Sequence, residues 1–101
     1  MNKTKVIQSL GLCKRANKLV SGETGVLDRI RKQTVYLVFL ASDAKKNTTK
    51  RIRDKSSFYK VKLIDSFTTE ELNRAIGTNN RKVIGITDRN FTKMIELQLE
   101  Q

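Results

Sequence analysis

The sequence has no histidine, no proline and a single cysteine, Cys13, in 101 residues. Without histidine, Ser-His and Cys-His catalysis, His-based general acid–base chemistry and the commonest zinc sites are all excluded. One cysteine cannot form an internal disulfide, and this usage fits a reducing compartment. We therefore expect a cytoplasmic protein that has none of these kinds of active site. In this setting Cys13 is expected to be a core residue.

Long apolar runs, internal repeats and linker-like stretches are also missing. No apolar run approaches the roughly 20 residues that a membrane span needs. The segment Met1–Lys5 lacks the apolar stretch of a signal peptide. A chain of this length has room for one core, so we expect a single domain over residues 1–101 and no membrane partner.

Acidic residues are scarce relative to basic ones, at 10 against 21, which gives a formal net charge of +11. Such a field attracts polyanions, nucleic acid above all. The densest basic segment is Lys45–Lys62, in which Asp54 is the only acid. Its lysines and arginines are typical of a solvated helix face. Because no interleaved glutamate neutralises the field, contact with phosphates is the favoured interpretation.

Apolar periodicity predicts alternating helices and strands. The central strand, Val35–Leu40, is apolar throughout, which indicates a strand covered on both faces. The predicted fold class is α/β, an α/β/α three-layer sandwich with a small, mixed sheet of about four strands; periodicity leaves the strand directions open. The expected helices are Lys3–Lys14, Gly22–Lys32, Asn47–Ser57, Thr68–Ile76 and a closing helix marked by Phe91, Met94, Ile95 and Gln98, and the other strands are Leu19–Val20, Lys60–Ile64 and Lys82–Thr87.

Three carboxylates, Asp43, Asp65 and Asp88, each follow a predicted strand. In a parallel sheet they would meet at one edge and could hold Mg²⁺ for phosphate hydrolysis. The alternative is that each caps a helix or a turn. Capping is favoured because no glycine-rich phosphate loop or paired acidic motif accompanies them.

The adjacent aromatic residues Phe58 and Tyr59 lie where the third helix should end. They could stack on nucleobases. The favoured interpretation is that the pair closes the core at the end of the helix.

The segment Leu19–Leu27 reads as two apolar residues, a small polar elbow and the start of a helix. Glu23 stands at that helix start, where a carboxylate offsets the helix dipole. A carboxylate there is also suited to accept hydrogen bonds from nucleobase donors. The polar loop Gly77–Lys82 leaves a similar choice, between a simple turn and contacts to bases and backbone.

Four motifs in this order resemble one family over nearly the whole chain. They are Leu10–Glu23, Val38–Thr48, Glu71–Gly77 and Val83–Asp88. The chain resembles the YlxQ-type proteins, the bacterial branch of the ribosomal L-seven-Ae superfamily. The resemblance implies one non-enzymatic RNA-binding domain with the α/β/α fold and no cofactor or metal, which binds kink-turns or related internal loops of structured RNA in a ribosomal or ribonucleoprotein context.

The resemblance also implies the contact residues. Well-known members read guanine edges with an Asn-Glu pair and a Lys one helical turn later. This chain keeps Glu23 but has Gly22 and Val26 at the other two places, which predicts an altered kink-turn site. A second contact zone corresponds to Asp43–Thr49, and a third to the loop at residues 78–81. The residues expected to contact RNA are Lys14, Arg15, Lys18, Ser21, Gly22, Glu23, Lys45, Lys46, Thr49, Lys50, Arg53, Thr78, Asn79, Asn80 and Arg81.

The expected partners are structured RNAs, ribosomal or other non-coding, together with proteins of ribosomal or ribonucleoprotein complexes. The alternative is an assembly protein whose main partner is another protein, with RNA contact incidental.

Overall fold

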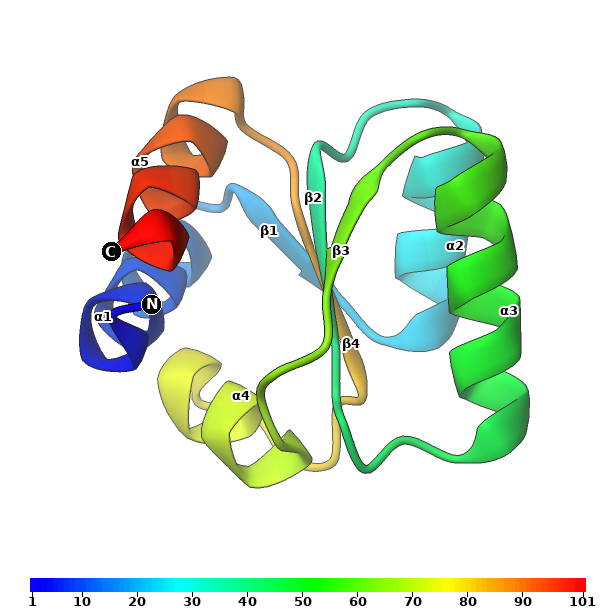
Figure 1. Ribbon diagram of the computed structural model, residues 1–101, viewed down its shortest axis with the longest axis horizontal. Helices are drawn as coiled ribbons and strands as arrows, with labels where there is room; N and C mark the ends of the chain where they lie inside the picture. Colours follow the sequence, from blue (N-terminus) through cyan, green and yellow to red (C-terminus); the bar gives the residue numbers. More distant parts are fainter.

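The computed structural model describes all residues, 1–101, as a four-stranded sheet between two layers of helices (Figure 1). This confirms the predicted α/β/α sandwich, and the element boundaries lie within a few residues of those expected. The elements in chain order are α1 (Lys3–Arg15), β1 (Leu19–Ser21), α2 (Glu23–Arg31), β2 (Leu37–Leu40), α3 (Lys46–Phe58), β3 (Lys62–Ile64), α4 (Thr69–Ile76), β4 (Val83–Ile86) and α5 (Arg89–Glu100).

The sheet is mixed, with the strand order β1-β4-β2-β3. Strand β4 runs antiparallel to both of its neighbours, while β2 and β3 are parallel. The ends of β1, β2 and β3 therefore lie beside the start of β4. We call this end of the sheet the loop edge; it carries the connections at residues 22, 41–45, 65–68 and 77–82 and lies at the bottom of Figure 1.

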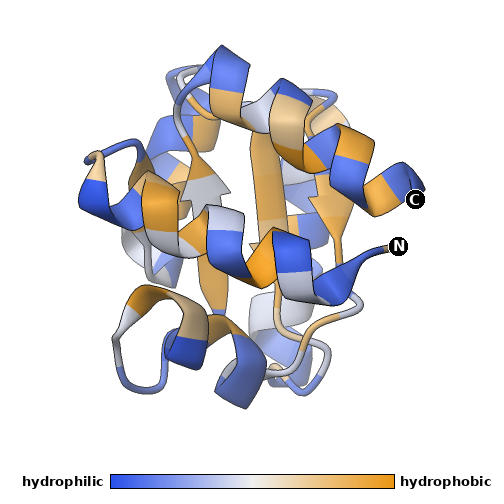
Figure 2. Ribbon diagram, turned by 90° about the vertical axis from the view of Figure 1, so that its left-hand side faces the viewer, coloured by the Kyte–Doolittle hydropathy of each residue, from blue (hydrophilic) through white to orange (hydrophobic).

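Helices α1, α4 and α5 cover one face of the sheet. Their apolar side chains pack with Leu37 and Phe39 of β2 in a cluster of 12 buried residues. Figure 2 shows this layer in front of the apolar strands. Phe39 and Phe67 meet edge to face at its centre, with ring centroids 5.6 Å apart. Cys13 is fully buried here, as expected, and burial raises the pKa of its thiol to about 11.

Helices α2 and α3 cover the other face. Here Val38 and Leu40 of β2 join a cluster of seven buried residues that includes Val26 and Ile52. Successive side chains of a strand point to opposite faces, so β2 supplies both clusters. The continuous apolar sequence of this strand therefore follows from its place between two helix layers.

The helices of the two layers begin differently. Side chains of Asn2, Thr68 and Asp88 cap α1, α4 and α5 by accepting hydrogen bonds from first-turn amides. At α4 this cap is a full capping box with Glu71, as the sequence predicts. The N-cap residues of α2 and α3 are Gly22 and Lys45, and neither makes a side-chain cap hydrogen bond.

The structure corrects the interpretation in which three aspartates share a metal ion. Because β4 is antiparallel to β2, Asp88 lies at the opposite end of the sheet from Asp43 and Asp65. Each carboxylate has a separate local role: Asp88 caps α5, Asp43 accepts hydrogen bonds from Thr69, and Asp65 pairs with Arg53. The capping and turn interpretation describes this arrangement.

The interpretation of Phe58 as a residue that closes the core is wrong. Its side chain is 76% exposed, although it meets the ring of Tyr59 edge to face. Tyr59 alone packs against the core cluster, from a half-buried position.

No helix combines the length and the apolar character needed to cross a membrane.

Candidate functional site

The turn from β1 into α2 brings bare backbone to the loop edge. The Gly22 amide donates to the Val83 carbonyl at 2.8 Å, which fixes the turn against β4. Gly22 has φ +95°, a conformation that strongly favours glycine. A Cβ atom added here would lie only 2.5 Å from Nη1 of Arg81. The backbone angle therefore favours glycine strongly, and any side chain at this position would also displace the Arg81 guanidinium.

Glu23 is held in place by α3. The Thr48 hydroxyl donates to Oε1 of Glu23 at 2.8 Å, and Nε of Arg51 donates to Oε2. The hydrogen bonds from Arg51 and Thr48 lower the pKa of the Glu23 carboxyl, so it is ionised at neutral pH. A carboxylate has about four acceptor positions, so capacity for further donors remains. Its side chain is 26% exposed, which leaves an oriented acceptor within reach of a ligand.

The start of α3 lies next to this carboxylate, because α2 and α3 pack side by side. Lys45 occupies the N-cap position without a side-chain hydrogen bond, and the first turn contains no acidic residue. The first amides of a helix have no partner within the helix, and their dipole favours anions. With α2 also uncapped, two helix starts at the loop edge leave amides available.

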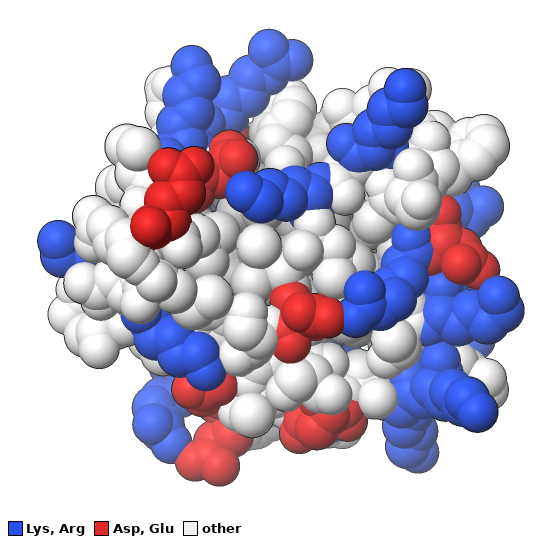
Figure 3. Space-filling view, viewed as in Figure 1, with Lys and Arg blue, Asp and Glu red and all other residues white.

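The charge of this region is strongly positive. Figure 3 shows Lys and Arg side chains crowded over α3, at the right of the view. Within α3, Arg51 pairs with Glu23, Arg53 with Asp65 and Lys50 with Asp54. Lys45 and Lys46 are exposed and have no ion-pair partner. The cations nearest the loop edge are thus free to meet an anion.

The loop between α4 and β4 is fastened by Asn73, a buried side chain of α4. Its Nδ2 donates to the carbonyls of Thr69 and Arg81, at 2.6 and 2.8 Å. Its Oδ1 accepts from the Thr78 hydroxyl at 2.7 Å and from the Arg81 amide at 2.8 Å. One side chain thereby fixes both ends of the 78–81 loop.

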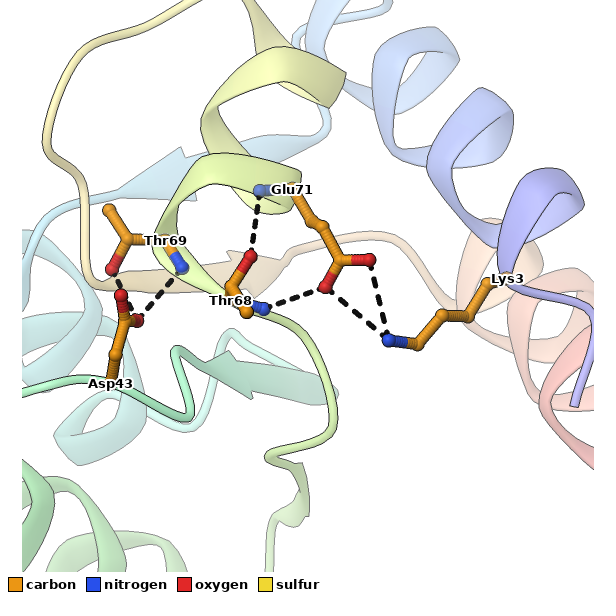
Figure 4. A network of polar contacts seen from close by, with 5 residues as sticks. All are labelled: Lys3, Asp43, Thr68, Thr69 and Glu71. Atoms are coloured by element: carbon orange, nitrogen blue, oxygen red, sulfur yellow. Dashed lines mark hydrogen bonds and ion pairs between the residues drawn. The ribbon is translucent and has the colours of Figure 1, made fainter.

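The turn after β2 is tied to the same region by a polar network (Figure 4). Asp43 accepts from the amide and the hydroxyl of Thr69, at 2.9 and 2.7 Å. These bonds lower the pKa of the Asp43 carboxyl. Nζ of Lys82 donates to the same hydroxyl at 3.1 Å. A depression of about 700 Å³ with no apolar lining residue opens between this network and the Asn79–Asn80 tip.

The structure brings most of the residues expected to contact RNA to the loop edge. Lys50 and Arg53 lie farther along α3, where their side chains are engaged in ion pairs with Asp54 and Asp65. The residues that meet at the loop edge are Ser21, Gly22, Glu23, Lys45, Lys46, Thr49, Thr78, Asn79, Asn80 and Arg81.

Lys14, Arg15 and Lys18 do not join this group. The Thr87 amide donates to the Lys18 carbonyl at 3.0 Å, so Lys18 lies at the far end of the β1–β4 ladder. Gly22 is four positions after Lys18, or about 13 Å of extended chain. The basic end of α1 is thus a separate patch.

Asn73 was not among the residues expected from the sequence, and Thr48 and Arg51 were expected only as members of the contact segments, not as partners of Glu23. The signal for Asn73 was a polar residue on the apolar side of α4, next to Leu72 and before Ile76. Thr48 and Arg51 point at Glu23 from a different helix, and sequence spacing carries no signal for that contact.

Comparison with known families shows to which family this chain belongs. Residues 4–96 match the model of the Ribosomal protein L7Ae/L30e/S12e/Gadd45 family. The chain belongs to this family. Within it, the chain is similar to two proteins called RNA-binding protein YlxQ. The one from Enterococcus faecium is 39% identical over 99 residues, covering 98% of this chain and 95% of the relative. The one from Bacillus subtilis (strain 168) is 43% identical over 89 residues, covering 87% and 89%.

Two solved structures share this fold. A Bacillus halodurans protein described as of unknown function superposes with a TM-score of 0.90 at 34% identity, covering 96% of this chain and 98% of that one. The Giardia lamblia 15.5kD RNA binding protein superposes with a TM-score of 0.83 at 13% identity, covering 96% and 83%. At such low identity the second likeness concerns the fold alone.

Proposed function

We propose that this chain is a non-enzymatic RNA-binding protein that grips structured RNA with its loop edge. The observation that carries the proposal is the meeting of two uncapped helix starts, the oriented carboxylate of Glu23 and the free cations of Lys45 and Lys46. Its YlxQ relatives, named as RNA-binding proteins, support the same conclusion.

Each group has a chemical role in this proposal. Lys45, Lys46 and the first amides of α3 meet phosphate oxygens, which positions the RNA. Glu23 accepts hydrogen bonds from guanine N–H groups. The bare backbone at Gly22 allows the RNA to approach closely. Ribosomal or other ribonucleoprotein complexes in the cytoplasm are the proposed setting.

The proposed target is a kink-turn or a related internal loop, read by an altered site. Val26 is fully buried in the α2–α3 core, so this position contributes no contact to RNA. Gly22 contributes backbone only. Of the Asn, Glu and Lys side chains with which well-known members read guanine, this chain then retains only Glu23. We therefore expect a smaller preference for tandem G·A pairs than in members that have all three.

A titration tests this proposal directly. The protein is titrated with a kink-turn RNA and with the same RNA carrying Watson–Crick pairs in place of the G·A pairs, at several salt concentrations. We expect affinity to fall steeply with salt, as phosphate-dominated binding does, and to be higher for the kink-turn. Absence of binding at low salt, or an affinity independent of salt, would contradict RNA binding. Equal affinity for both RNAs would contradict the kink-turn preference alone.

The second candidate is an assembly protein whose main partner is another protein. Glu23→Ala and Lys45→Ala discriminate between the two. If RNA is the main partner, both variants bind RNA more weakly while remaining folded. If RNA contact is incidental, both keep the affinity of the wild type.

A further inference from the structure

We infer that Arg81 is a specificity-determining residue that reads a guanine base jointly with Glu23. This inference rests on the proposed RNA-binding function and adds a base contact to it. Its starting point is the position of the Arg81 guanidinium, whose Nη1 lies 2.5 Å from where a Cβ of residue 22 would be. The guanidinium therefore occupies the space above the Gly22 turn that a side chain would otherwise fill.

The backbone of Arg81 is rigidly placed. Asn73 accepts from its amide and donates to its carbonyl, each at 2.8 Å. Because Asn73 is itself only 7% exposed and uses both atoms of its amide group, this clamp orients Arg81 before any ligand arrives. With the backbone held in advance, only the Arg81 side chain loses conformational freedom on binding.

The Arg81 side chain is also unengaged. The guanidinium groups of Arg51, Arg53 and Arg74 are held in ion pairs with carboxylates. Arg81 is exposed and has no ion-pair or hydrogen-bond partner for its side chain. Its N–H donors therefore remain available to a ligand at the turn.

The neighbouring groups indicate what kind of ligand fits. Glu23 follows Gly22 directly, so a fork of donors stands beside a carboxylate acceptor. A phosphate would meet the Glu23 carboxylate as a like charge. Guanine presents acceptors at O6 and N7, which suit a bidentate arginine, and carries its N1–H donor next to O6. The pair Arg81 and Glu23 therefore matches one guanine better than it matches a phosphate.

Atomic substitution in the RNA tests this contact. Replacing the guanines of the G·A pairs by 7-deazaguanine removes the N7 acceptor and leaves the N1–H donor in place. Losing half of a bidentate pair should weaken binding by the wild type about five- to tenfold. Binding by Arg81→Met should be weaker than that of the wild type and should not respond to the substitution. Arg81→Lys keeps the charge but lacks the fork, so it should respond little.

Arg29→Met is the matched control. It removes the same charge from an exposed arginine in the last turn of α2, far from the loop edge. This variant should keep the full response to 7-deazaguanine. If Arg81→Met responds as strongly as the wild type, or Arg81→Lys binds as tightly as the wild type, the guanine contact is wrong and RNA binding by the loop edge still stands. If the wild type binds neither RNA at low salt, the proposed function fails as well.

A double-mutant cycle tests the packing of Arg81 on Gly22. A Cβ at residue 22 would push the guanidinium aside. Gly22→Ala should weaken RNA binding in both backgrounds, because φ +95° strains any side chain, and it should weaken binding severalfold more in the wild-type background than in the Arg81→Met background. Equal losses in both backgrounds would show that Arg81 is not seated over the turn when RNA binds.

Discussion

The two helix layers on either side of the sheet differ in how their helices are capped and in how much core they share. Helices α1, α4 and α5 have side-chain caps and share the larger buried cluster, of 12 residues. Helices α2 and α3 have no side-chain caps and share a cluster of seven. The first layer satisfies its own polar groups, whereas the second leaves amides and cations for a partner. The comparison teaches that stability and binding are largely assigned to opposite faces of one sheet.

The largest effect on stability should come from large-to-small substitutions in the two cores, at neighbouring positions of β2. Phe39→Ala removes a large side chain from the 12-residue cluster and should lower the free energy of unfolding by about 3 to 5 kcal/mol. Val38→Ala, on the other face, should cost about 2 kcal/mol. Urea denaturation measures both. A loss below about 1 kcal/mol for either variant would contradict the place of that residue in a packed core.

A smaller loss is expected when the loop clamp is removed. Asn73→Ala leaves the Arg81 amide and carbonyl without their partners and should cost about 2 kcal/mol. Hydrogen exchange of the Arg81 amide should accelerate by more than the global destabilisation explains. Asn79→Ala, at the exposed tip of the same loop, serves as the control and should change neither quantity. An unchanged exchange rate in Asn73→Ala would show that the clamp does not hold the loop.

Removing a cap from the stable layer should separate stability from binding. Thr68→Ala abolishes the hydrogen bond to the Glu71 amide and should cost about 1 to 2 kcal/mol. Its affinity for RNA should stay within about twofold of that of the wild type at a temperature where both are folded, because α4 begins with its own cap satisfied. A large loss of affinity would show that the capped layer also takes part in binding.

Adding an N-cap to α3, in the binding layer, should raise stability without improving the affinity for RNA. Lys45→Ser and Lys45→Ala remove the same charge, but only serine can cap α3. The serine variant should be the more stable of the two by about 0.5 to 1 kcal/mol. It should bind RNA no better than the alanine variant, because its hydroxyl accepts the hydrogen bond of an amide that would otherwise donate to the RNA. Tighter binding by the serine variant would contradict the role of the free amides.

The smallest expected effect is a change in acid stability at Glu23. Arg51 and Thr48 depress the pKa of this carboxyl in the folded state. A depressed pKa contributes stability above the unfolded value, about 4.3, and this contribution is lost as pH falls through the folded value. Thermal unfolding of Glu23→Gln should therefore depend less on pH below about 4.5 than that of the wild type. Parallel curves would show that the ion pair adds no net stability.

Local signals in the sequence were enough to predict most of the fold. The unbroken apolar run of β2, the capping box of Thr68 and Glu71 and the left-handed Gly77 at the end of α4 each mark an element through its own residues. The antiparallel direction of β4 was not predictable, because periodicity says which residues face the core and nothing about which strand lies beside which. That direction separates Asp88 from the other two aspartates.

The candidate site was predictable only as a set of segments. The turn at Gly22 and the loop at residues 78–81 are visible as polar breaks between apolar elements. Their meeting through Asn73, Arg81 and the missing Cβ of Gly22 depends on contacts between distant elements. The basic run Lys14–Lys18 looked equivalent to Lys45 and Lys46, yet strand pairing places it at the other end of β1.

Mapping the amide resonances on addition of RNA tests the central claim most directly. On titration with a kink-turn RNA, we predict the largest shifts at Gly22–Gly25, at Lys46–Thr49 and in the loop at residues 78–82. Residues 32–36 and 59–61, at the opposite end of the sheet, should move little. Shifts concentrated at that opposite end, or on the capped helices α1 and α5, would contradict the assignment of RNA binding to the loop edge.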